Sequence, residues 1–162
     1  MKSPLPEVPS PQPDEQVPLR AVPSAVRAAM LLLVAFGIAN IVREATYVIG
    51  AIQSYGHVGW RDVRGVIRAV VLLVTACLFA WRLGQRDEWA WWMTVIGSLI
   101  YSLKLGWELF YLMSMRARGY TNTEVQIVLL IAMLGMLVTA SLYLLSRGGR
   151  APFGYGPKPK IS

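Results

Sequence analysis

Four long apolar stretches, separated by short polar segments, dominate the middle of the chain. Each runs for 20 residues or more, and a helix of about 20 residues rises about 30 Å, the thickness of a bilayer's hydrocarbon core. Within residues 28–39, 69–81 and 127–138 there is no polar stripe of the kind that a soluble bundle helix presents to water. We therefore expect an all-α integral membrane protein, with a four-helix transmembrane bundle over residues 24–147. The helices are predicted over about 25–49, 63–83, 89–113 and 122–146.

Local signals place the ends of these helices. Ser24 stands where the first helix begins and is a suitable N-cap. Thr121 and Glu124 have the spacing of a capping box at the start of the fourth helix. The linker 84–88 is short and polar, which predicts that the second and third helices are antiparallel neighbours.

The two ends of the chain have a different composition from the middle. Residues 1–23 hold seven of the ten prolines, and residues 148–162 are rich in glycine, proline and basic side chains. Proline removes a backbone donor and favours extended geometry in its neighbour, so neither segment fits a packed element. We expect a disordered proline-rich N-terminal tail and a disordered basic C-terminal tail.

Charge and composition support the membrane interpretation. Of the 162 residues, 55% are apolar and 15% charged, against about 25% charged in soluble domains. The net charge is +7, but the basic residues stand at the ends of the apolar stretches rather than along one polar face. That arrangement fits contact with anionic lipid head groups and does not indicate nucleic-acid binding.

The distribution of lysine and arginine predicts an orientation. Four spans place both termini on one side, and that side carries nine basic residues against six on the other. The positive-inside rule then favours cytoplasmic termini. The junction of Trp81-Arg82-Leu83-Gly84 and Trp89-Ala90-Trp91-Trp92 resembles one found in many small bacterial multispan proteins, and we expect the plasma (inner) membrane of a bacterium.

The most informative residues are the ionisable and polar ones within the spans, where a charge costs about 2.5–3.5 kcal/mol. The first and third helices run the same way, so their C-terminal thirds lie at one membrane level. The second and fourth helices begin at that level. Residues from all four helices are thereby predicted to form one polar cluster: Asn40, Arg43, Glu44, Arg68, Tyr101, Lys104, Glu108 and Glu124.

Three interpretations of this cluster stay open. In the first, the cluster is an ion-pair network that fixes helix register. In the second, its long side chains reach up to the membrane interface. In the third, it lines a pocket for an ion, a lipid head group or a small polar solute. In each case the polar half of the bundle lies beneath the loops at 48–62 and 114–123.

No recognised catalytic, cofactor or metal motif accompanies the cluster. His57 lies in a glycine-rich turn without ligands at metal-binding spacing, and Cys77 is expected to be a small buried apolar residue. The leading hypothesis is a non-enzymatic membrane protein, either an accessory subunit or a helix- and lipid-interacting protein, with the anionic bilayer and a membrane protein or a second copy as partners. The alternative is a small transporter or channel for an ion or polar solute, and a membrane enzyme ranks last.

Overall fold

The computed structural model describes residues 22–118 and 124–154, and every regular element within these ranges is helical. The long helices are α1 (Ser24–Tyr55), α2 (Trp60–Gly84), α3 (Glu88–Ala117) and α4 (Glu124–Leu145). All four are long and apolar enough to cross a membrane. For these ranges, the predicted all-helical chain with four helices of membrane-spanning length is confirmed.

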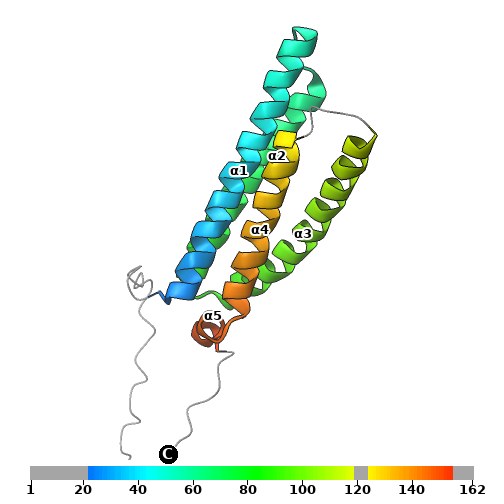
Figure 1. The fold of residues 1–162 in the computed structure, drawn as a ribbon. Coiled ribbons are helices and arrows are strands. Elements are labelled where there is room, and N and C mark those ends of the chain that lie inside the picture. Colours follow the sequence, from blue (N-terminus) through cyan, green and yellow to red (C-terminus); the bar gives the residue numbers. More distant parts are fainter. Residues whose placement is uncertain (1–21, 119–123, 155–162) are drawn as a thin grey trace, which may run out of the picture.

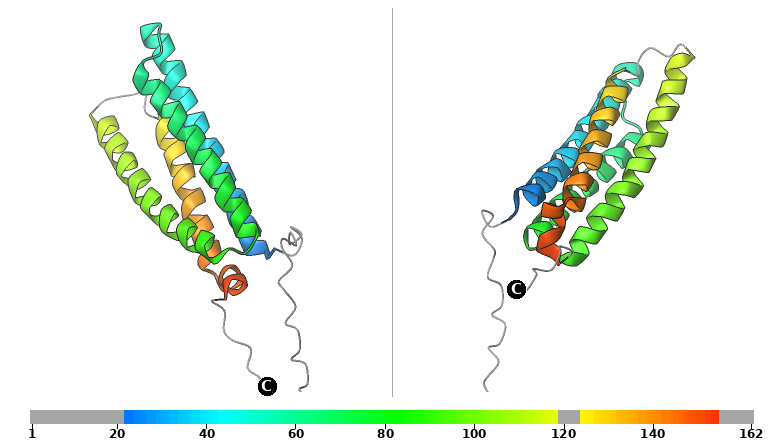
Figure 2. Two further views of the ribbon diagram at one scale, coloured as in Figure 1. Left: turned by 180° about the vertical axis from the view of Figure 1, so that it is seen from behind. Right: turned by 60° about the horizontal axis from the view of Figure 1, so that its bottom comes forward.

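The four helices form an open arc rather than a closed square. α2 packs chiefly against α1, α1 against α4, and α4 against α3, whereas α2 and α3 pack weakly on each other. Figures 1 and 2 show α3 leaning away from α2 toward the end that carries the α1–α2 connection. The sequence predicted α2 and α3 as antiparallel neighbours. They are joined by the short connection 85–87, but apart from their joined ends they pack weakly on each other.

Several helix ends differ from the prediction. α1 continues to Tyr55, where Gly56 adopts a left-handed conformation and its amide bonds the carbonyl of Ile52. Ser24 is not the N-cap: Pro23 takes that position, and no side chain caps the helix. At the start of α2 the Gly59 amide donates to the Asp62 carboxylate at 2.9 Å, a cap that the sequence analysis did not identify.

Some terminal predictions lie outside the described residues. Thr121, one half of the predicted capping box, is among them, as are residues 1–21 and 155–162 of the predicted tails.

Two short helical elements after α4 cover one end of the bundle. This is the end at which the described chain begins and finishes. After α4, Ser146 caps the one-turn helix α5 (Arg147–Arg150), and the 3₁₀ turn η2 (Ala151–Phe153) follows. Phe153 is buried and its ring centroid lies 6.2 Å from that of Trp91, whose indole NH donates to the Leu144 carbonyl at 3.1 Å. Residues 148–154, predicted to be disordered, therefore pack against the bundle.

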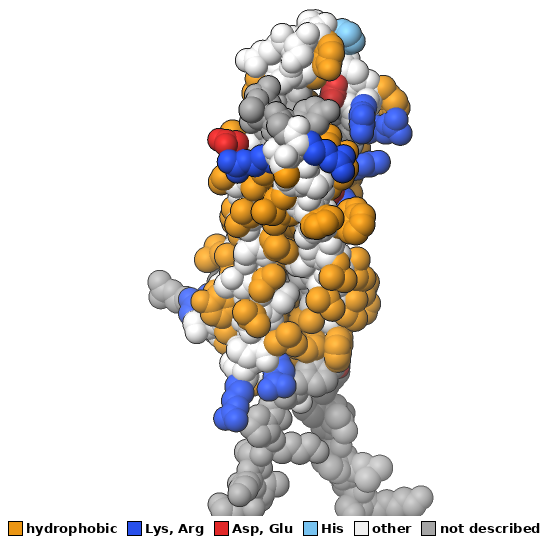
Figure 3. Space-filling view, turned by 45° about the vertical axis from the view of Figure 1, so that its right-hand side comes forward, with side chains coloured by type: hydrophobic (Ala, Val, Ile, Leu, Met, Phe, Trp, Pro, Cys, Tyr) orange, Lys and Arg blue, Asp and Glu red, His pale blue; other side chains and the backbone are white. Residues whose placement is uncertain are grey.

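The outer faces of the helices are apolar. Large exposed side chains include Leu31, Val74, Leu103 and Trp107. Cys77, predicted to be buried, is exposed on α2. In Figure 3 the apolar side chains form a broad band, with basic side chains gathered above and below it. This banding is what a bilayer requires of a protein that it surrounds.

A glycine sets the close approach of α1 and α2. Gly37 is buried, and a Cβ built on it would lie 2.8 Å from Leu73 Cδ1 and 3.0 Å from Leu73 Cα. The second of these atoms belongs to the backbone, so side-chain movement alone does not relieve the clash.

The variant Gly37→Ala should lower the free energy of unfolding by about 1–3 kcal/mol through overpacking. Thermal unfolding in detergent micelles measures the effect. Gly135→Ala on α4 is the matched control, because a Cβ there meets nothing within 4 Å. Equal melting temperatures for the two variants would contradict the close α1–α2 contact.

Candidate functional site

Arg43 is the centre of the charged network. Its side chain is 10% exposed, and its two terminal nitrogens bond the carboxylates of Glu44 at 3.0 Å and Glu108 at 2.9 Å. The other oxygen of Glu108 lies 3.6 Å from the Lys104 ammonium, one turn earlier on α3. A single carboxylate thus links a buried cation on α1 with an exposed cation on α3.

The same segment of α1 also contacts α2 and α4. The Thr46 hydroxyl donates to the Arg43 carbonyl at 2.7 Å and accepts from the Gln126 amide of α4 at 3.0 Å. On the other side, a Cβ built on Gly65 of α2 would collide with the Glu44 carboxylate. Glycine at position 65 therefore leaves the space that this carboxylate occupies beside Arg43.

A cavity of about 390 Å³ opens beside this network, between α1, α2 and α3. Asn40, which is 2% exposed, lies at its floor, whereas Ile67 and Val71 on α2 and Lys104 on α3 are exposed at its rim. The cavity is therefore a crevice with an open side, through which it faces the surroundings of the bundle.

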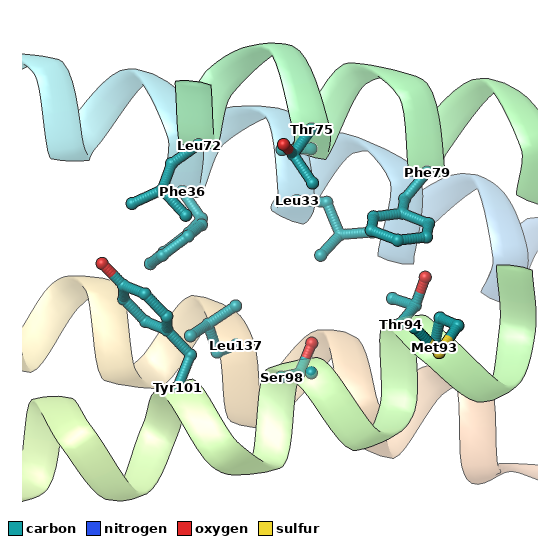
Figure 4. Close-up of a pocket in the computed structure, with 12 residues that line it drawn as sticks. Leu33, Phe36, Leu72, Thr75, Phe79, Met93, Thr94, Ser98, Tyr101 and Leu137 are labelled. Atoms are coloured by element: carbon teal, nitrogen blue, oxygen red, sulfur yellow. The ribbon is translucent and has the colours of Figure 1, made fainter. Parts of the chain in front are cut away.

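A second, apolar cavity of about 190 Å³ continues the crevice toward the end where the termini lie. Figure 4 shows Leu72 and Phe79 approaching from α2, with the hydroxyls of Thr94 and Ser98 directed into the space from α3. Leu72 and Tyr101 line both cavities. The Tyr101 ring meets Phe36 edge to face, with centroids 5.4 Å apart. The two cavities therefore lie end to end between α2 and α3, one charged and one apolar, and we refer to them together as the crevice.

The structure brings seven of the eight residues of the predicted cluster to the charged cavity. They are Asn40, Arg43, Glu44, Arg68, Tyr101, Lys104 and Glu108. Glu124 lies elsewhere: it pairs at 2.9 Å with Arg116, and both side chains are more than half exposed. Helix depth had placed Glu124 at the right level, but depth alone does not give the direction in which a side chain points.

Three participants were missed by the sequence analysis: Thr46, Gly65 and Gln126. For Gln126 the sequence held a signal, because a polar side chain inside an apolar helix indicates a partner. Gly65 gives no signal alone, since its role depends on Glu44 across the interface.

The site combines a charged cavity with an apolar one, and both can bind a ligand. Among residues 22–118 and 124–154 there is no group of three or more His, Cys, Asp or Glu side chains placed to hold a metal ion. Three buried polar atoms have no hydrogen-bond partner within the described chain: Asn40 Oδ1, Arg43 Nε and Gln126 Oε1.

Comparison with known proteins finds no matching family model, no similar curated protein and no similar solved structure. Functional inference therefore rests on the crevice and its residues.

The variant Glu108→Gln should destabilise the bundle, because it leaves the buried Arg43 with one carboxylate in place of two. We expect a loss of about 1–3 kcal/mol, below the full cost of breaking a buried pair because the Glu108 side chain is one-third exposed. Glu124→Gln, which removes the exposed pair with Arg116, should cost at most about 1 kcal/mol. Unfolding in detergent compares them, and an equal cost for both variants would argue against Arg43 as the centre of the network.

Proposed function

We propose that this chain is a non-enzymatic, multi-pass integral membrane protein that acts through contacts with lipid and with other membrane helices, and that it holds a lipid chain between α2 and α3. One observation carries this proposal: the α2–α3 crevice is open on one side to whatever surrounds the helices, within the membrane-spanning lengths of α2 and α3. In a membrane protein the surrounding medium at that level is lipid.

The shape and lining of the crevice suit a lipid chain better than a polar solute. Its apolar part is lined by Leu33, Phe36 and Phe79, and its rim carries the exposed Met93. From Arg68 to Phe79 the crevice follows α2 for about 16 Å. A polar solute would leave this length unused, whereas an acyl chain would fill it and gain apolar contact along it.

A small transporter or channel is the second candidate. The observation in its favour is the charged cavity, two of whose lining residues carry a buried polar atom without a partner in the described chain, Asn40 Oδ1 and Arg43 Nε. Against it stands the apolar continuation of the crevice, because a single copy then offers no continuous polar path past Tyr101.

Blocking the apolar part should release bound lipid. Gly97 lines it, and a Cβ built there meets nothing within 4 Å, so the side chain of Gly97→Leu would extend into the space that a chain would occupy. Gly106→Leu is the matched control on α3: its Cβ is equally free, and it does not line the crevice. After mild detergent purification, lipid that remains bound is counted by native mass spectrometry.

We expect lipid on the wild type and on Gly106→Leu, and none on Gly97→Leu. Equal retention by all three proteins, or none by any, would refute the lipid proposal. If proteoliposomes then carry a flux of ions or polar solutes that Lys104→Ala and Glu108→Ala abolish in folded protein, the transporter is the better account.

For the orientation we propose cytoplasmic termini, on the basis of the excess of lysine and arginine on the terminal side. The resemblance of the 81–92 junction to small bacterial multispan proteins leads us to propose the bacterial plasma membrane. A reporter that is active only in the cytoplasm, fused after Ser162, should give a signal. The same reporter inserted in the α1–α2 connection after His57 should be silent. The reverse pattern would invert the topology.

A further inference from the structure

The charges that line the crevice do not balance. Arg43, Arg68 and Lys104 face two carboxylates, those of Glu44 and Glu108. Both carboxylates are engaged by Arg43, and Glu108 is shared with Lys104. Arg68 makes no ion pair with any residue in the described part of the chain. The lining thus carries one surplus positive charge, on the α2 side of the opening.

The position of Arg68 suits a head group. It stands eight residues after Trp60, the first residue of α2, and so about 12 Å along the helix. Its exposed side chain is long enough to reach from there toward the membrane interface while its stem stays among apolar groups. The charged end of the crevice is therefore near the level of lipid phosphates, with the apolar end directed to the membrane interior.

Asn40 provides a second, independent indication of a ligand. Its side chain is buried on the cavity floor, and its Oδ1 has no hydrogen-bond partner among the residues that the structure describes. A buried acceptor without a partner costs about 1–3 kcal/mol. A ligand hydroxyl would satisfy this acceptor, which neither Arg43 nor Lys104 does, once the Asn40 side chain turned its Oδ1 to the cavity.

We propose, on the basis of the function proposed above, that the crevice selects an anionic phospholipid with a hydroxylated head group. Its phosphate lies between Arg68 and Lys104, a head-group hydroxyl donates to Asn40, and one acyl chain extends past Tyr101 toward Phe79. The two carboxylates do not repel this phosphate strongly, because their charges are already matched by Arg43 and Lys104. A choline head group would instead bring a cation to the side of the crevice with surplus positive charge.

The test compares phosphatidylglycerol with phosphatidylcholine of identical acyl chains. Each lipid is titrated into the purified, delipidated full chain in detergent, and binding is measured by native mass spectrometry. The wild type should bind phosphatidylglycerol more tightly. Arg68→Gln and Lys104→Gln should each weaken phosphatidylglycerol binding about fivefold, the effect of one interfacial cation. They should weaken phosphatidylcholine binding less, because the choline cation already offsets the charge of its phosphate.

Arg64→Gln is the matched control. Arg64 lies one turn before Arg68 on α2 and is also exposed, but it lies over the Trp60 ring and does not line the cavity. This variant should bind both lipids as the wild type does. Thermal unfolding of each variant shows that it is folded under the conditions of the titration.

Each remaining outcome overturns part of the scheme. If the wild type binds the two lipids with equal affinity and Gly97→Leu abolishes the binding of both, head-group selection is refuted and the lipid site stands. Binding of neither lipid would refute the proposed function as well. A wild-type dimer that Gly97→Leu converts to a monomer would assign the crevice to a second copy of the chain.

Discussion

The positive charge of Arg43 has to be matched inside an apolar bundle, and this requirement organises the rest of the structure. Glu44 on the same helix and Glu108 on α3 match it, so the rotation of α1 and the height of α3 are fixed together. Both partners must stay close, because a buried guanidinium that loses its counter-charge is strongly destabilising. At the same level, Thr46 and Gly65 connect α1 with α4 and α2.

The two sides of α1 differ in how they reach their neighbours. Toward α2 the contact is between backbones, since Gly37 leaves no room for a side chain against Leu73. Toward α3 the contact is made by long side chains, the Arg43–Glu108 pair and the Phe36–Tyr101 ring contact. A helix held by long side chains stands further off. The open space between α2 and α3 is the consequence, and its polar and apolar ends follow from which residues meet there.

The sequence was sufficient for the helices and for most of the cluster. Apolar stretches of spanning length predict helices because the bilayer requires internally bonded backbone. Helix direction and rise predict which residues share one membrane level, which is how Arg43, Lys104 and Glu108 were grouped. The sequence was not sufficient for features that depend on which helices pack together. The connection 85–87 does not dictate that α3 packs on α4. Glu124 shares the depth of the cluster but faces away from it, and the roles of Gly37 and Gly65 depend on Leu73 and Glu44, which lie on other helices.

The length of α1 has a mechanical consequence. Its 32 residues extend for about 48 Å, well beyond a hydrocarbon core of about 30 Å. Arg43 lies some 18 Å before its last residue, Tyr55, so the helix beyond the charge network is a rigid arm that ends at the α1–α2 connection. A tilt of α1 by a few degrees at the level of Arg43 displaces the tip of that arm by an ångström or more. A ligand in the crevice that tilted α1 would therefore also move the α1–α2 connection, on the far side of the bundle from the termini.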